Sequence, residues 1–84
     1  MKFYYITFRS VTFAQRAEQL LQGERIRCTL LRTPRWMEVQ GCGYCLRLWT
    51  DDISIALRLL RNRQIPLRKV YIQAPDGQLE ERHL

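Results

Sequence analysis

Three cysteines stand out as residues that could do chemistry: Cys28, Cys42 and Cys45, in a chain of 84 residues. Cys42 lies between Gly41 and Gly43 in the stretch "GCGYCLRLW". Glycines on both sides remove steric cover and free backbone amides that can hold a thiolate. Arg35 and Arg47 could add positive charge that lowers the pKa of the thiol. Cys42 is therefore a candidate nucleophile, and a surface cysteine without a role fits the residues equally well.

The spacing of Cys42 and Cys45 could also indicate half of a metal site or a redox pair. A zinc site needs four ligands, and the chain offers little beyond Cys28 and His83, so no metal is expected. A thioredoxin-like pair needs a helix N-terminus, whereas this pair enters a strand. On an extended strand, residues three apart point to opposite faces, so a disulfide between Cys42 and Cys45 is not favoured. Cys28 shares a strand face with apolar neighbours and is expected to be inert.

The elements that must position these residues follow from periodicity. Alternating apolar residues predict strands over 3–8, 26–31, 44–49 and 67–72. Helical spacing predicts one helix after Ser10 or Thr12 that stops at Gly23, and another that Asp51 or Asp52 caps. The order β-α-β-β-α-β predicts an α+β, ferredoxin-like two-layer sandwich, with two helices on one face of a four-stranded antiparallel sheet. We expect one domain over 1–75 and a loose polar tail over 76–84.

Charge and composition limit the function classes. The net charge is +6, and twelve of the fourteen cationic side chains are arginine, which favours anionic partners. The N-terminus shows no secretory signal pattern and no segment has the length of a membrane span, so we expect a cytoplasmic protein. The sequence shows no carboxylate pair, Ser-His-Asp set or phosphate-binding glycine loop, and it indicates no cofactor. An accessory or carrier protein is expected rather than an enzyme.

Three stretches carry a resemblance to a family: "YYITFRSVTFAQRAEQLL", "TPR" at residues 33–35 and "CGYCLR" at residues 42–47. They resemble the small bacterial selenium/sulfur carrier-like proteins. The resemblance implies a persulfide or selenosulfide on Cys42, passed from a donor protein to an acceptor protein. Cys45, where many relatives carry alanine, would be the weaker candidate and a resolving thiol. The stretch "WMEVQG" before Cys42 departs from the family pattern and is about one residue longer. The residues expected to support the site are Pro34, Arg35, Gly41, Gly43 and Arg47.

Two other classes remain open. RNA-recognition modules share this element order, and the stretch overlaps their third-strand signature at Gly41, Gly43 and Tyr44, although cysteine and arginine stand where two aromatics belong. Alternatively, aromatic residues on the open sheet face indicate a regulatory or scaffolding module that pairs with itself, as a homodimer, or with an enzyme. Partial cover of these residues by the loop and the tail fits the sequence equally well. The residues of that face are Phe3, Tyr5, Trp49 and Tyr71.

Overall fold

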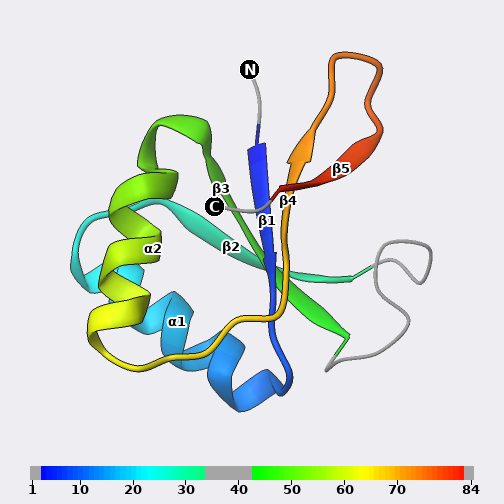
Figure 1. Cartoon of the computed structure of the whole chain (residues 1–84). Helices are drawn as coiled ribbons and strands as arrows, with labels where there is room; N and C mark the ends of the chain where they lie inside the picture. The colour runs from blue at the N-terminus through cyan, green and yellow to red at the C-terminus, as the bar shows by residue number, and fades with distance from the viewer. Residues whose placement is uncertain (1–2, 34–42, 83–84) are drawn as a thin grey trace.

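The computed structural model describes residues 3–33 and 43–82 and consists of a sheet covered by two helices (Figure 1). In chain order the elements are β1 (Phe3–Thr7), α1 (Val11–Gly23), β2 (Cys28–Arg32), β3 (Tyr44–Trp49), the short 3-10 helix η1 (Thr50–Asp52), α2 (Ile53–Asn62), β4 (Val70–Gln73) and β5 (Leu79–Arg82). The expected α+β class and the two expected helices are confirmed.

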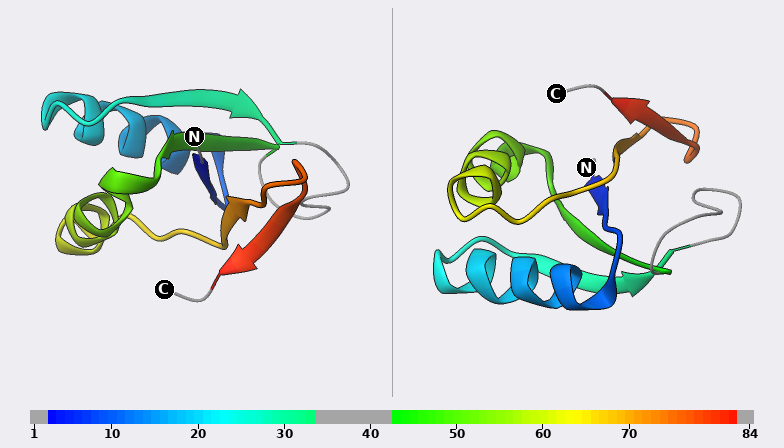
Figure 2. Two further views of the ribbon diagram at one scale, coloured as in Figure 1. Left: turned by 90° about the horizontal axis from the view of Figure 1, so that it is seen from above. Right: turned by 60° about the horizontal axis from the view of Figure 1, so that its bottom comes forward.

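The sheet has the order β2-β3-β1-β4-β5, and every neighbouring pair is antiparallel. Ile6 in the central strand β1 pairs with Leu46 of β3 on one side and with Val70 of β4 on the other. Both helices lie on the same side of this sheet, and α1 packs against β2 and β3, running along β2 in the two further views (Figure 2). The first and third strands are therefore neighbours, as the sequence predicts.

One hydrophobic core fills the space between the sheet and the helices. Strand alternation sends Ile6, Leu46 and Leu48 into it, and all three are buried. Small residues of the helices, Ala17 in α1 and Ala56 in α2, are completely buried in the same cluster, which allows the helices to approach the sheet closely. The face that carries Tyr44, Leu46 and Leu48 is thus the helix-facing side, and the opposite face carries Cys45 and Arg47.

A fifth strand corrects the expected number of strands. Residues 79–82, expected in a loose polar tail, form β5 and pair with β4. A turn joins the two strands: Gly77 adopts φ +91°, and the Gln78 N–H donates a 3.0 Å hydrogen bond to Asp76 Oδ1. The sequence "LEER" lacks the β-branched and aromatic residues that signal a strand, so its pairing depends on the turn and on backbone hydrogen bonds.

Strand β4 begins later than expected, at Val70 rather than at residue 67. The preceding backbone is held by Thr7, whose side-chain hydroxyl accepts a 3.1 Å hydrogen bond from the Lys69 N–H. The Thr7 N–H also donates to the Lys69 carbonyl over 2.9 Å, and the Arg68 N–H donates to the Thr7 carbonyl over 2.8 Å. Thr7 is 1% exposed, so this side chain fixes the entry to β4 from within the fold.

Helix α1 begins at Ser10, whose hydroxyl accepts a 3.2 Å hydrogen bond from the Phe13 N–H. Ser10 was one of the two expected caps. The helix ends at Gly23, but the left-handed residue is Arg25, with φ +63°. The Ile26 N–H bonds to the Leu21 carbonyl and the Arg25 N–H to the Gln22 carbonyl, the Schellman pattern of a helix C-terminus.

Helix α2 ends in the same way. Asp52 is its N-cap residue but makes no side-chain cap hydrogen bond. At the C-terminus the Ile65 N–H bonds to the Leu60 carbonyl, and the Gln64 N–H to the Arg61 carbonyl, with Gln64 at φ +57°. Both helices thus end with Leu-Leu, four further residues and a buried isoleucine, in "LLQGERI" and "LLRNRQI". The hydrophobic contact that accompanies a Schellman motif explains the repeated isoleucine.

We expect Gln64→Gly to stabilise the protein, because a left-handed conformation strains any residue with a Cβ atom. The free energy of unfolding should rise by about 1 kcal/mol, or roughly 4–8 °C in Tm for a domain of this size, measured by thermal denaturation. The control Arg58→Gly, on an exposed position within α2, should lower stability by about 1 kcal/mol. A loss of stability in Gln64→Gly would contradict the assigned C-terminus of α2.

Candidate functional site

The base of the candidate site lies where β2 ends and β3 begins. The Thr33 N–H donates a 2.8 Å hydrogen bond to the Gly43 carbonyl, and the preceding pair, Arg32 and Tyr44, lie opposite each other in the sheet. This bond closes the two strands below the segment that contains Cys42. Cys42 itself and three of the expected supporting residues, Pro34, Arg35 and Gly41, lie outside the described residues.

Gly43 is the described half of the glycine pair that flanks Cys42. Its φ is +81°, a region that side chains rarely adopt. A Cβ atom added to Gly43 would meet nothing within 4 Å, so the backbone conformation rather than space requires glycine here. The chain therefore turns sharply immediately after Cys42 and before the first residue of β3.

Two polar groups at this base, Arg32 and Thr33, were not among the expected site residues, although Thr33 belongs to the "TPR" stretch. The guanidinium of Arg32 lies over the Tyr44 ring, with its central carbon 5.3 Å from the ring centroid. The Thr33 hydroxyl is buried and has no hydrogen-bond partner within the described part of the chain. The sequence could have indicated both residues, because they lie immediately before Pro34 and Arg35. They place a cation and a hydroxyl donor beside Gly43.

Arg47, expected to support Cys42, has a different neighbour in the structure. Its guanidinium carbon lies 4.6 Å from the centroid of the Phe3 ring, and Phe3 pairs with Trp49 at the end of β3 remote from Gly43. Arg47 lies four positions along the chain from Gly43, a distance of about 13 Å on an extended strand. Direct support of Cys42 by Arg47 stays a prediction, and Arg32 is the described cation next to Gly43 in the register.

Cys28 and Cys45 lie on opposite faces of the sheet. Cys28 pairs with Leu48 on the helix-facing side, and its Sγ donates a weak 3.9 Å hydrogen bond to the Glu18 carbonyl of α1. Burial, with a smaller contribution from the Glu18 carboxylate, raises the pKa of the Cys28 thiol to about 11. Cys28 is therefore a protonated thiol near neutral pH, as expected for an inert residue.

Cys45 points to the helix-free face but is only 1% exposed. Its register partners are Thr7 in β1 and Leu31 in β2. A thiol in this position could meet another sulfur only after local opening of the fold. Its expected role as a resolving thiol stays a prediction, and the burial sets a condition that such a role would have to meet.

The helix-free face is less aromatic than expected. Phe3, Tyr5 and Trp49 are half-buried, but Tyr71 is only 7% exposed and cannot contribute to an open aromatic surface. Phe3 and Trp49 contact each other, with ring centroids 4.6 Å apart. The predicted four-residue aromatic surface is corrected to these three side chains, and the homodimer expected from it stays a prediction.

A basic depression lies at the remote end of β3, where β1 begins and α1 ends. Its volume is about 550 Å³, and Phe3 and Trp49 form its aromatic part. Three arginines line it without any acidic residue among the lining side chains: Arg25, Arg27 and Arg47. Cations next to two aromatic rings form a surface that suits an anionic, planar ligand.

The described residues form neither a metal-binding cluster nor a membrane-spanning helix. Within residues 3–33 and 43–82, no three histidine, cysteine or acidic side chains are grouped so that they could hold a metal ion. No helix in the same part of the chain has the length and apolar character needed to cross a membrane.

The fold is that of a small α+β domain, and in the sequence the motif cysteine precedes the inner strand β3. The chain belongs to the family described as "Putative Se/S carrier protein-like", whose model matches residues 3–72. The resemblance seen in the sequence is thereby confirmed. No curated protein and no solved structure matches the chain.

We expect Cys28 to resist alkylation in the folded protein, because its raised pKa keeps the thiol protonated. With iodoacetamide and mass spectrometry, labelling of Cys28 should be slow at pH 7 and should rise steeply as the pH approaches about 11. The folded state holds this proton more tightly than the unfolded state does. The contribution of Cys28 to stability is therefore complete below pH 9.0 and falls between pH 9.0 and about 11.

The unfolded protein in denaturant provides the control, since every thiol should then react at the rate of an ordinary cysteine. Rapid labelling of Cys28 in the folded protein at pH 7 would contradict the assigned environment of this residue.

Proposed function

We propose that this protein carries sulfur or selenium on Cys42 as a persulfide or selenosulfide and passes it to an acceptor protein. The observation that carries the proposal is the family match over residues 3–72, which includes the stretch "CGYCLR". The proposed setting is the cytoplasm, where thiols are kept reduced. The order of the first four strands, β2-β3-β1-β4, supports a ferredoxin-like classification as part of the same proposal.

The proposed transfer conserves atoms and electrons. The Cys42 thiolate attacks the outer sulfur of a donor persulfide, a new S–S bond forms at Cys42, and the donor cysteine leaves as a thiolate. Delivery is the same reaction with an acceptor thiolate as the attacking group. A selenium atom in place of the outer sulfur follows the same sequence of bond changes.

The other two cysteines make poor carriers, and this supports Cys42. Cys28 has a raised pKa and bonds toward α1, while Cys45 is almost completely buried. A carrier thiol has to be a thiolate that large partner proteins can reach. Gly43, which follows Cys42 in the sequence, has a positive φ that glycine adopts readily, and this fits a glycine-flanked carrier cysteine.

Arg32 and Thr33 are the described groups that could assist the proposed thiolate. A guanidinium favours a nearby thiolate over a thiol, and a hydroxyl without another partner can donate a hydrogen bond to it. Cys45 keeps a secondary role in the proposal, as the thiol that would resolve a persulfide if the fold opened locally.

The direct test is sulfur loading followed by mass spectrometry. Incubation with a cysteine desulfurase and cysteine should add the mass of one sulfur atom, located on Cys42. Cys42→Ser should lose the addition, while Cys28→Ser and Cys45→Ser should keep it. Loading of Cys42→Ser at the wild-type level, or an unmodified Cys42 under conditions that load a known carrier, would contradict the proposal.

A second candidate function, binding of single-stranded nucleic acid, is favoured by the basic depression alone. Nucleobases can stack on Phe3 and Trp49, and phosphates can meet the neighbouring arginines. The stacking of Arg47 on Phe3 already shows that this ring accepts a planar cation. The residues involved lie at the opposite end of β3 from Gly43, so this function would not need Cys42.

Fluorescence anisotropy with a labelled oligonucleotide at low salt tests this candidate. Arg27→Gln should weaken binding about 3-fold to 10-fold and reduce the salt dependence by about one phosphate contact. The exposed Arg58→Gln serves as the matched control and should bind like the wild type, as should Cys42→Ser. Absence of binding at low salt, or an equal loss in the control, would remove this candidate.

A further inference from the structure

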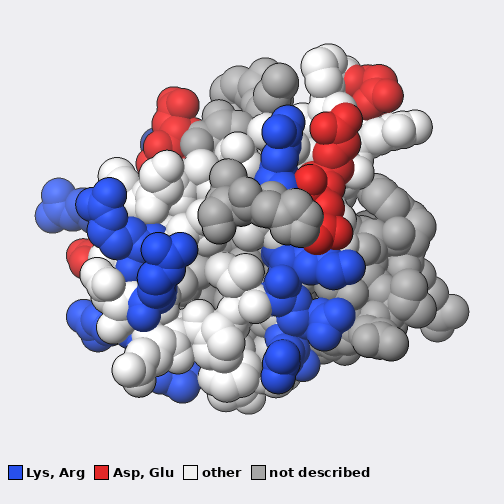
Figure 3. Space-filling model, in the orientation of Figure 1, with Lys and Arg blue, Asp and Glu red and all other residues white. Residues whose placement is uncertain are grey.

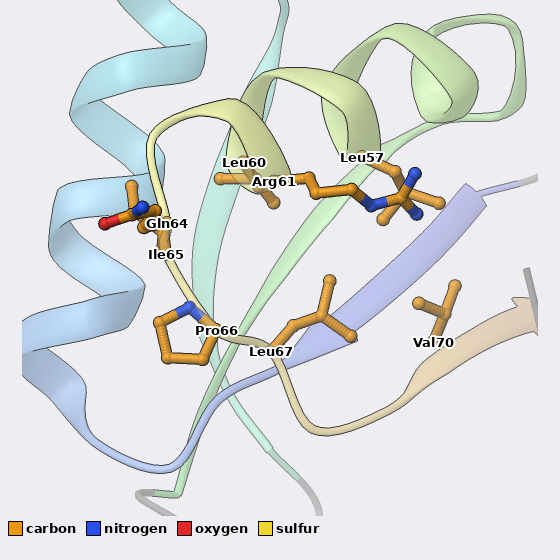
Figure 4. Close-up of a pocket in the computed structure, with 8 residues that line it drawn as sticks. All are labelled: Leu57, Leu60, Arg61, Gln64, Ile65, Pro66, Leu67 and Val70. Atoms are coloured by element: carbon orange, nitrogen blue, oxygen red, sulfur yellow. The ribbon is translucent and has the colours of Figure 1, made fainter.

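An apolar cavity of about 370 Å³ lies between the second half of α2 and the start of β4 (Figure 4). It is on the helix side of the sheet, separate from both the Cys42 motif and the basic depression. Six apolar side chains and two polar ones line it: Leu57, Leu60, Arg61, Gln64, Ile65, Pro66, Leu67 and Val70. Cavities of this size and character are typical of small-molecule sites.

The cavity follows from the way α2 ends. The left-handed Gln64 turns the chain away from the helix, and residues 65–69 cross to β4 without helix or strand structure. The floor is formed by Leu60, Ile65 and Val70, each at most 7% exposed, whereas Leu57 and Leu67 on the walls are half-buried. The hollow is open to solvent, so an apolar ligand that covers its leucines would remove apolar surface from water.

The segment that forms the cavity carries charge of one sign, although Glu81 of β5 lies 3.7 Å from Lys69. Residues 53–75 contain no aspartate or glutamate and five cations: Arg58, Arg61, Arg63, Arg68 and Lys69. Two groups of such side chains flank a band of uncharged ones on this face of the molecule (Figure 3). Arg61 extends beside Leu57 at the cavity and has no ion-pair partner among the described residues (Figure 4). The ligand should therefore carry a negative charge.

The surroundings favour a small ligand over a protein. A stable protein interface buries about 800 Å² per partner. Among the described residues, however, the exposed large hydrophobic side chain is Ile55, at 52% exposure. Ile55 lies about 200° around α2 from Leu57, on the other side of the helix. A second copy of the chain would also bring the same cations against each other, which disfavours a homodimer through this face.

We propose that this cavity binds a small aliphatic carboxylate, with the alkyl chain against the leucines and the carboxylate at Arg61. A guanidinium binds a carboxylate with two parallel hydrogen bonds, and the Gln64 amide can donate a third. No aromatic ring lines the cavity, so a nucleobase would find no stacking partner there. The inference goes beyond the carrier function and does not depend on Cys42.

The experiment is a titration of the full chain with octanoate, followed by NMR of the backbone amides. Chemical-shift changes should be confined to residues 57–70, and octanol should bind about tenfold more weakly because it cannot pair with the guanidinium. Octylammonium, with the same chain and the opposite charge, should bind still more weakly. Binding that is equal for octanoate and octylammonium would overturn the proposal.

Matched variants test whether Arg61 binds the carboxylate and whether the alkyl chain occupies the cavity. Arg61→Gln should weaken octanoate binding about tenfold, while Arg58→Gln, on the exposed surface of the same helix, should change it less than about twofold. Leu57→Trp, which fills the cavity from a half-buried position, should abolish binding in a protein that keeps its folded NMR spectrum. Cys42→Ser should bind octanoate like the wild type.

Three further outcomes would overturn the inference. One is an equal loss of affinity in Arg58→Gln and Arg61→Gln, which would indicate general attraction to a basic surface. Another is undiminished binding in folded Leu57→Trp. The third is sedimentation of the free protein as a dimer whose interface protects residues 57–70, which would make a second copy the occupant of the cavity.

Discussion

The pairing of β3 on both edges is the constraint on which the rest of the structure depends. Because β1 and β2 both hydrogen-bond to it, each side chain of β3 is assigned to one face, and a slip of one residue would exchange the faces. This register places Leu46 and Leu48 in the core and Cys45 on the far side, and it puts Gly43 at the point where the strand begins. The pairing register of β3 thus determines both the core and the candidate site, so a substitution that shifts this strand would disrupt both.

Much of the fold was predictable because it depends on local sequence patterns. Strict alternation predicted the bounds of β3, and helical spacing together with Ser10 predicted α1. The fifth strand was missed because Glu80, Glu81 and Arg82 carry no strand preference, and their pairing with β4 depends on a turn. Gly23 indicated where α1 ends, but the end depends on the contact between Leu21 and Ile26. The matching sequence at the end of α2 could have revealed this pattern.

The candidate site was predictable only in part. The separation of Cys42 from Cys45 by strand parity stays a prediction, whereas the apolar strand context of Cys28 agrees with its protonated thiol. The expected cation Arg47 instead stacks on Phe3, a cross-strand contact that depends on register and rotamer. The cavity beside α2 was missed for a similar reason, because it arises from the path of residues 65–69 rather than from any residue type. In the sequence, the absence of acidic residues over 53–75 was the one indication of this cavity.

The hydrogen bond between Thr33 and Gly43 has a consequence for how this family can vary. It holds the two ends of the intervening segment at a distance set by the sheet, so an insertion there has no need to change the strand register. We expect the segment between Arg35 and Cys42 to be about one residue longer than the family pattern, and β2 and β3 pair in one continuous register from Cys28 and Leu48 to Arg32 and Tyr44. A change in the length of this segment therefore need not shift the strands that carry the core.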